Sequence, residues 1–167
     1  MKKLFYLLVL ITLIGSGGGV YYMTQNNIEE LIVCATDDKA SYIPAIVCET
    51  YLLNYRGHGA DLQYLKTRTG LNFLTNIEDV SIRNQLFKFF IGRGMNINAV
   101  SPVDGLTPLH AAVLLNDSEL ARFLIKQGAN PRVREKNSAL TPLEYLDLMN
   151  AQYPGINRDK TRQALSH

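Results

Sequence analysis

The chain has 167 residues, of which 47% are hydrophobic and 19% are charged, a composition that excludes an intrinsically disordered protein. The formal charge is +2, from 17 basic and 15 acidic residues, and without Lys2 and Lys3 the basic residues also number 15. A neutral domain has no general attraction for nucleic acid or anionic lipid, so we exclude nucleic-acid binding. The length allows one folded domain with a substantial core behind a leader.

The first 24 residues have the pattern of a secretory signal. Lys2 and Lys3 precede an apolar run from Leu4 to Ile14 that only Thr12 interrupts. Two interpretations stay open. The small residues 16–19 could serve a signal peptidase, or the 20 residues 4–23, about 30 Å as a helix, could remain as a membrane anchor. Both place everything after residue 24 in the periplasm, either soluble or tethered to the inner membrane.

The next segment predicts two helices and contains both cysteines of the chain. Pro44, after Ser41, indicates a helix start, so that residues 45–55 would form one helix and Cys48 would face Cys34 on the preceding helix. An even pair in an exported chain favours a disulfide, and two buried small side chains are the alternative. A spacing of 14 without a CxxC motif or a nearby histidine pair argues against a metal site.

Internal repeats dominate the remainder of the chain. The sequences "GLTPLHAAV" from Gly105 and "SALTPLEYL" from Ser138 place Thr-Pro-Leu twice, 34 residues apart. The same offset relates "LFKFFIGRGMNINA" (86–99) to "LARFLIKQGANPRV" (120–133), and "YLLNYRGHGADLQ" (51–63) places Gly59-Ala60-Asp61 another 35 residues earlier. Such a period predicts stacked supersecondary units that bury their apolar faces against one another.

These motifs resemble ankyrin repeats, most closely over 104–133, less so over 138–150 and 86–100, and weakly over 26–63. The segment "TGLNFLTNIEDV" departs from the pattern, because it lacks the Thr-Pro pair and the histidine. The resemblance implies an all-α solenoid of three to four helix-turn-helix units in residues 25–167, behind a signal or anchor segment at 1–24. The units would span about 26–63, 64–100, 101–134 and 135–167.

Local signals agree with this resemblance. Thr107 can cap a helix whose first turn accommodates Pro108, and Gly128 can end the second helix of that unit. After Pro154-Gly155 the chain can resume as a short polar helix from Asn157, which would shield the end of the stack from water.

No reaction site is visible in the sequence. His110 resembles the ankyrin histidine that bonds the backbone of a neighbouring turn, and His58 belongs to an exposed loop. Triads, paired-carboxylate pockets, HExxH and phosphate-loop motifs are all lacking. The sequence therefore predicts a protein that is not an enzyme and has no metal, cofactor or small-molecule substrate.

Binding in repeat proteins falls to the concave face and the projecting loops. We predict partner contacts in the best repeat, in the loop before it and in two charged loops. The candidate residues are Leu114, Leu115, Val103, Asp104, Arg132, Arg134, Glu135, Lys136, Lys66 and Arg68.

Small exported ankyrin proteins of bacteria resemble immunity proteins that protect the periplasm against type VI secretion effectors, including phospholipases. The resemblance implies a protein partner, namely a secreted effector enzyme that the chain would bind and neutralise. Two alternatives stay open, namely an envelope scaffold or adaptor, and a helper of a periplasmic oxidative-stress enzyme.

Overall fold

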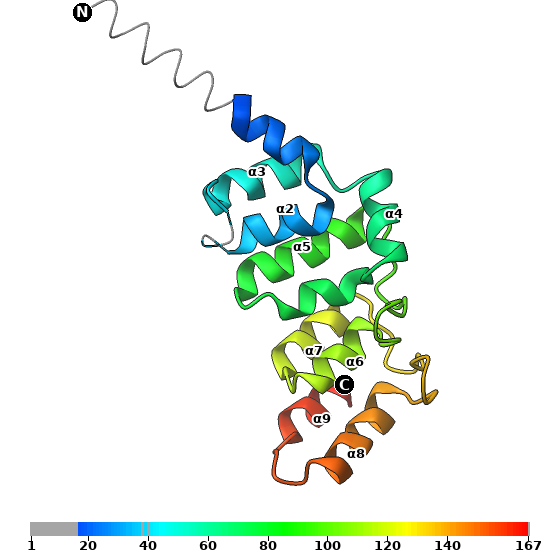
Figure 1. Cartoon of the computed structure of the whole chain (residues 1–167). Coiled ribbons are helices and arrows are strands. Elements are labelled where there is room, and N and C mark those ends of the chain that lie inside the picture. The colour runs from blue at the N-terminus through cyan, green and yellow to red at the C-terminus, as the bar shows by residue number, and fades with distance from the viewer. Residues whose placement is uncertain (1–16, 38, 40, 167) are drawn as a thin grey trace, which may run out of the picture. The chain divides into compact units, whose positions relative to one another are not determined.

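The computed structural model describes residues 17–37, 39 and 41–166 (Figure 1). Over these residues the fold is all-helical without strands, as the sequence predicts. The chain divides into two compact units, residues 1–57 and 58–167. Residues 1–16 of the predicted signal or anchor segment 1–24 lie outside the described residues, in which no helix is long and apolar enough to cross a membrane.

Unit 1 contains a helical stretch at 17–25 and the paired helices α2 (Ile28–Thr36) and α3 (Ala45–Tyr55). The bounds of α3 confirm the prediction. Helix α2 begins with a capping box, in which Asn27 Oδ1 accepts from the Glu30 N–H at 3.0 Å and Glu30 Oε2 accepts from the Asn27 N–H at 3.1 Å. The Arg56 guanidinium after α3 donates to the carbonyls of Met23 and Asn26, which fixes the entry into α2.

A disulfide joins Cys34 of α2 to Cys48 of α3, with their Cα atoms 5.8 Å apart. Both cysteines are buried, at 2% and 0% exposure. The bond lies between the two helices that form the core of unit 1, alongside the buried Leu31, Ile32 and Leu52.

Unit 2 is built from two rows of helices. The elements η1 (Gly70–Asn76), α6 (Pro108–Leu114) and α8 (Pro142–Gln152) form an inner row, in which α6 contacts both of the others. The outer row contains α5 (Val80–Gly92), α7 (Ser118–Lys126) and α9 (Asp159–Leu165), each packed on the inner element that precedes it. Helix α4 (Ala60–Thr67) contacts η1 at the start of the unit. Figure 1 shows the α6–α7 and α8–α9 pairs as successive layers.

The predicted caps are confirmed in the best repeat. The Thr107 hydroxyl accepts from the His110 N–H, Pro108 occupies the first turn of α6, and Gly128 follows α7 with φ 97°. Thr141 repeats the arrangement in α8, with a capping box to Glu144. The final helix is α9, which starts at Asp159 and buries three side chains against the stack.

Gly59 differs from the sequence pattern. The repeat comparison equates Gly59 with glycines that follow an outer helix, but it precedes α4, with φ 52°. Gly57, with φ 80°, is the glycine that follows α3. Because two glycines stand within three residues there, the sequence offset selected the wrong one. Helix α4 also runs across position 63/64, where we expected one repeat to end.

Apolar and ionic contacts join the outer helices of unit 2. Phe87 of α5 and Phe123 of α7 have ring centroids 6.0 Å apart. Arg83, which is 6% exposed, forms an ion pair with the N-cap residue of α7, Asp117, at 3.0 Å. The Thr161 hydroxyl of α9 donates to Asn116 Oδ1 at 2.7 Å. The segment 116–117, which leads into α7, therefore makes polar contacts with both neighbouring outer helices, α5 and α9.

Candidate partner-binding surface

Two similar loops of unit 2 enter the inner helices α6 and α8. The Ser101 N–H donates to the Leu106 carbonyl at 2.8 Å, and the Glu135 N–H donates to the Leu140 carbonyl at 3.0 Å, 34 residues later. The loops are tied together, since the Lys136 N–H donates to the Gly105 carbonyl at 2.9 Å. On the other side, a Cβ added to Gly70 would lie 3.5 Å from Ser101 Cα, so the start of η1 abuts the first loop.

We call the surface formed by residues 66–70, 100–106 and 132–140 the finger edge. Figure 1 shows the loops that precede α6 and α8 on the same side of unit 2 as α4. The finger edge carries eight of the predicted partner residues, namely Lys66, Arg68, Val103, Asp104, Arg132, Arg134, Glu135 and Lys136.

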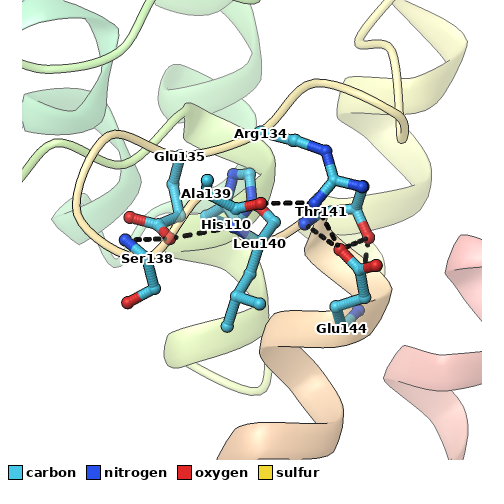
Figure 2. Close-up of polar contacts among 8 residues, drawn as sticks. All are labelled: His110, Arg134, Glu135, Ser138, Ala139, Leu140, Thr141 and Glu144. Atoms are coloured by element: carbon cyan, nitrogen blue, oxygen red, sulfur yellow. Dashed lines mark hydrogen bonds and ion pairs between the residues drawn. The ribbon is translucent and has the colours of Figure 1, made fainter.

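His110 lies inside the junction between the two repeats and is fully buried. Its Nε2 lies 2.9 Å from the carbonyl of Leu140, and both residues are drawn in Figure 2. Its Nδ1 lies 2.7 Å from the Thr107 hydroxyl. Because a carbonyl only accepts, Nε2 carries the proton and Nδ1 accepts from Thr107. Burial lowers the His110 pKa, against smaller opposing effects of the Leu140 carbonyl and of Glu135. The predicted structural role of His110, a hydrogen bond to the backbone of a neighbouring turn, is confirmed.

Asn72 makes the corresponding contact one repeat earlier, which the sequence analysis missed. Its Nδ2 donates to the Leu106 carbonyl at 3.0 Å, the equivalent of the Leu140 carbonyl that His110 contacts. The signal was present in the sequence, because "GLNFLT" from Gly70 aligns with "GLTPLH" from Gly105 at an offset of 35. Asn72 thus stands at the position of the cap residue Thr107, and its side-chain amide makes the contact that His110 makes in the next repeat.

Glu135 is a correction to the predicted partner surface, because it is only 3% exposed. Its carboxylate accepts from the N–H groups of Asn137, Ser138 and Leu140 at 2.6, 2.7 and 3.1 Å. Burial raises its pKa, but these backbone donors and His110 outweigh burial, and the net pKa is lowered. The Glu135 carboxylate therefore stabilises the conformation of its own loop, and its hydrogen-bonding capacity is used by backbone groups of that loop.

Arg134 is exposed but bound to its own repeat (Figure 2). Its Nη1 forms an ion pair with Glu144 Oε2 at 3.2 Å and also donates to the Ala139 carbonyl. The Glu144 pKa is lowered, chiefly by hydrogen bonds from the Thr141 backbone and hydroxyl, with a smaller contribution from Arg134. An exposed ion pair of this kind contributes little to stability, so it leaves Arg134 able to change partners.

The other predicted partner residues of the finger edge face solvent. Val103 is 74% exposed, and the charged side chains that lie exposed with it are Lys66, Arg68, Asp104, Arg132 and Lys136. A hollow of about 140 Å³ opens beside Val103, lined also by Asn72, Phe73 and Asp104. The edge therefore combines positive charge with an apolar tip and a small recess.

Leu114 and Leu115 are both 48% exposed but lie away from the finger edge. They stand at the far end of α6, whose seven residues span about 10 Å from Thr107. There the Asn116 side chain donates to the Asn157 carbonyl at 2.9 Å, which brings the loop before α9 alongside. The structure thus divides the predicted partner residues between two opposite edges.

We call this second surface, residues 77–79, 114–119 and 153–160, the turn edge. It has a hollow of about 480 Å³ lined by Asn116, Ser118, Asn157, Asp159 and Lys160. Tyr153 and Ile156 are about half exposed there, and the sequence analysis did not select them. Their signal was an apolar pair within the polar stretch after α8.

The described residues of both edges lack a cluster of metal-binding side chains. In residues 17–37, 39 and 41–166 no group of three or more histidine, cysteine or acidic side chains is placed to hold a metal ion.

The stacked helix pairs of unit 2 and the similar loops that precede α6 and α8 define a helical repeat protein. Residues 104–136 match the family of the ankyrin repeat, so the chain contains an ankyrin repeat, a protein-interaction fold. Over 62 residues the chain is 37% identical to the human 2-5A-dependent ribonuclease. That alignment covers 37% of this chain but only 8% of the human protein, and no solved structure matches.

Proposed function

We propose that this protein is an exported immunity protein, which binds a cognate secreted antibacterial effector in the periplasm and neutralises it without catalysis. The coarser part of this statement, a module that binds protein, follows from the ankyrin repeat at 104–136. The effector that fits best is a type VI lipase. The feature that supports an exported guardian is the sequence of residues 2–14, where two lysines precede an apolar run.

The rigidity of the finger edge supports a binding function of this kind. Glu135, Asn137 and the Lys136–Gly105 backbone bond hold the two loops in one conformation. A surface that is ordered before binding loses less conformational entropy on association, which favours tight one-to-one binding. An inhibitor that covers the active site or lid of a toxin benefits from that property.

A protection experiment tests the proposal. Each secreted lipase encoded by the source organism is directed to the periplasm of susceptible cells, with and without this full chain. We expect one lipase to be neutralised, so that survival rises by several orders of magnitude. A chain that lacks residues 1–24, made at the same level in the cytoplasm, should give no protection.

Two results would contradict the proposal. One is that no secreted enzyme of the organism becomes less toxic in the presence of the chain. The other is equal protection by the cytoplasmic version, which would show that the partner is met before export.

A further inference from the structure

The acidic side chains of the finger edge accept hydrogen bonds within the protein, whereas its basic side chains are exposed to solvent. The edge contains two carboxylates, Asp104 and Glu135. Asp104 Oδ1 accepts from the Leu106 N–H at 2.9 Å, and both Asp104 oxygens lie within 3.3 Å of Asn72 Nδ2. Glu135 is buried, and its carboxylate accepts from three backbone N–H groups. Both carboxylates are thus occupied by donors of the protein itself.

The five basic residues of the same edge are all exposed, namely Lys66, Arg68, Arg132, Arg134 and Lys136. The sequence "RVREKN" suggests a loop of mixed charge, but in the structure its only acidic residue is withdrawn from solvent. The finger edge therefore presents mainly positive charge.

The turn edge has the opposite sign. It contains five acidic residues, Glu78, Asp79, Asp117, Glu119 and Asp159, and two basic residues, of which Arg158 is buried. Asp79 and Asp117 cap the N-termini of α5 and α7, where the backbone N–H groups favour negative charge. Unit 2 is thus polarised along its inner helices.

We propose that the finger edge recognises an acidic protein surface, with Lys66, Arg68, Arg132 and Lys136 facing carboxylates of the partner. This inference rests on the proposed protein-binding function and specifies the chemistry of the partner. Arg134 can exchange its internal contact with Glu144 for a carboxylate of the partner, because exposed ion pairs are weak. Val103 and the recess of about 140 Å³ beside it supply the apolar contact at the centre.

A protein fits this edge better than nucleic acid does. Stacking on nucleic-acid bases requires well-exposed aromatic rings, and residues 66–70, 100–106 and 132–140 contain none. The neighbouring rings are only partly exposed, because Phe73 lines the recess and the Arg68 guanidinium lies 5.1 Å from the centre of the Tyr64 ring.

The test compares two variants of the full chain that lose the same charge. The finger variant combines Lys66→Gln, Arg68→Gln, Arg132→Gln and Lys136→Gln. The control variant combines Lys39→Gln, Lys88→Gln, Arg122→Gln and Lys126→Gln, whose side chains are exposed outside both edges. Circular dichroism establishes that both variants keep the helical fold.

Binding is measured by fluorescence anisotropy, with a labelled polyglutamate peptide as the probe at 20 mM and 200 mM salt. We expect the control variant to bind as the unmodified chain does, and the finger variant to bind at least tenfold more weakly. Binding should weaken at the higher salt concentration, because exposed charges are screened.

Several outcomes would overturn the proposal. They are no binding of the peptide at 20 mM salt, equal losses in the two variants, or tighter binding of a DNA duplex or anionic vesicles than of the peptide. Concentration-dependent self-association that the finger variant abolishes would identify a second copy, through its turn edge, as the occupant instead. None of these outcomes bears on the protection experiment, so the two proposals can fail separately.

Discussion

Ala139 occupies a position of the repeat whose backbone conformation suits glycine. Its φ is 55°, in the left-handed region, and the equivalent residue of the preceding repeat is Gly105, with φ 71°. An L-residue in this region is strained by its Cβ, by about 1–2 kcal/mol, and glycine avoids that strain at an entropic cost of about 0.5–1 kcal/mol. The sequence "SALTPLEYL" thus keeps the Thr-Pro signal but has the less suitable residue before it.

We expect Ala139→Gly to raise the free energy of unfolding by about 0.5–1 kcal/mol, because it removes the Cβ strain at a conformation the loop already adopts. Urea denaturation at pH 7 measures the change. The matched substitution Gly105→Ala should destabilise by more than 1 kcal/mol, roughly, since the new Cβ would also lie 3.0 Å from Asn137 Oδ1. If Ala139→Gly destabilises the protein, the left-handed assignment at this position is wrong.

At the scale of the helices, each inner element is joined to the loop of the next repeat by a side chain that contacts a loop carbonyl, and this side chain differs between the two junctions. His110 contacts the Leu140 carbonyl from α6, and Asn72 contacts the Leu106 carbonyl from η1. The last inner helix has Glu144 at the position of His110, where it forms a capping box with Thr141 instead. A carboxylate suits that position, because Glu144 Oε2 accepts from the Thr141 N–H and hydroxyl at 2.8 and 2.9 Å.

The His110 junction predicts a pH dependence of stability. Burial lowers the pKa of folded His110, so below about pH 6.5 the unfolded chain binds a proton that the folded protein resists. Stability should therefore be complete above pH 7 and fall towards pH 5, by at most about 1.4 kcal/mol per pH unit. Glu135, whose pKa is also lowered, adds a loss of the same sign only at lower pH, in the range where carboxylates titrate.

His110→Gln tests this expectation. It should lower stability at pH 7 by about 1–3 kcal/mol, the cost of disturbing a buried hydrogen-bonded group, and should remove most of the slope between pH 7 and 5. The control is His58→Gln, which replaces an exposed imidazole and should keep the slope. The assignment fails if His110→Gln and the unmodified chain show the same pH dependence in urea denaturation.

For the whole molecule, the two compact units differ in what stabilises them. The core of unit 1 includes a disulfide between two helices, whereas unit 2 has no cysteine and depends on repeat-to-repeat packing. Closing a loop with a sequence separation of 14 stabilises a fold by about 3 kcal/mol in the chain-entropy account. Reductant should therefore affect the units unequally.

Hydrogen exchange with and without reductant measures this difference. We expect amides of α2 and α3 to lose protection on reduction while those of α6 and α7 keep it, because only unit 1 contains the bond. The double variant Cys34→Ser with Cys48→Ser should be insensitive to reductant. Two free thiols in the unreduced, unfolded chain would contradict the bond itself.

Sequence and structure agree best where a local signal is repeated. The Thr107-Pro108 cap, the glycine after α7 and the helix at 45–55 each depend on a few neighbouring residues, and each was predictable. The 3₁₀ element η1 was less so, because Asn72 and Phe73 replace the Thr-Pro pair and the cap is lost. Gly59 was misplaced because a sequence offset alone does not distinguish a glycine that ends a helix from one that starts the next.

The sequence by itself determined the helical repeat, its period and the helix caps, since these depend on residues close to one another in the chain. Only the tertiary structure decided which of the candidate side chains are exposed and which of them lie on the same edge. The loop at 132–137 brings Glu135 under three N–H groups of residues 137–140 and leaves its basic neighbours outside, and the length of α6 separates Leu114 from Val103. Burial and the sign of a surface depend on packing between repeats, which no local pattern specifies.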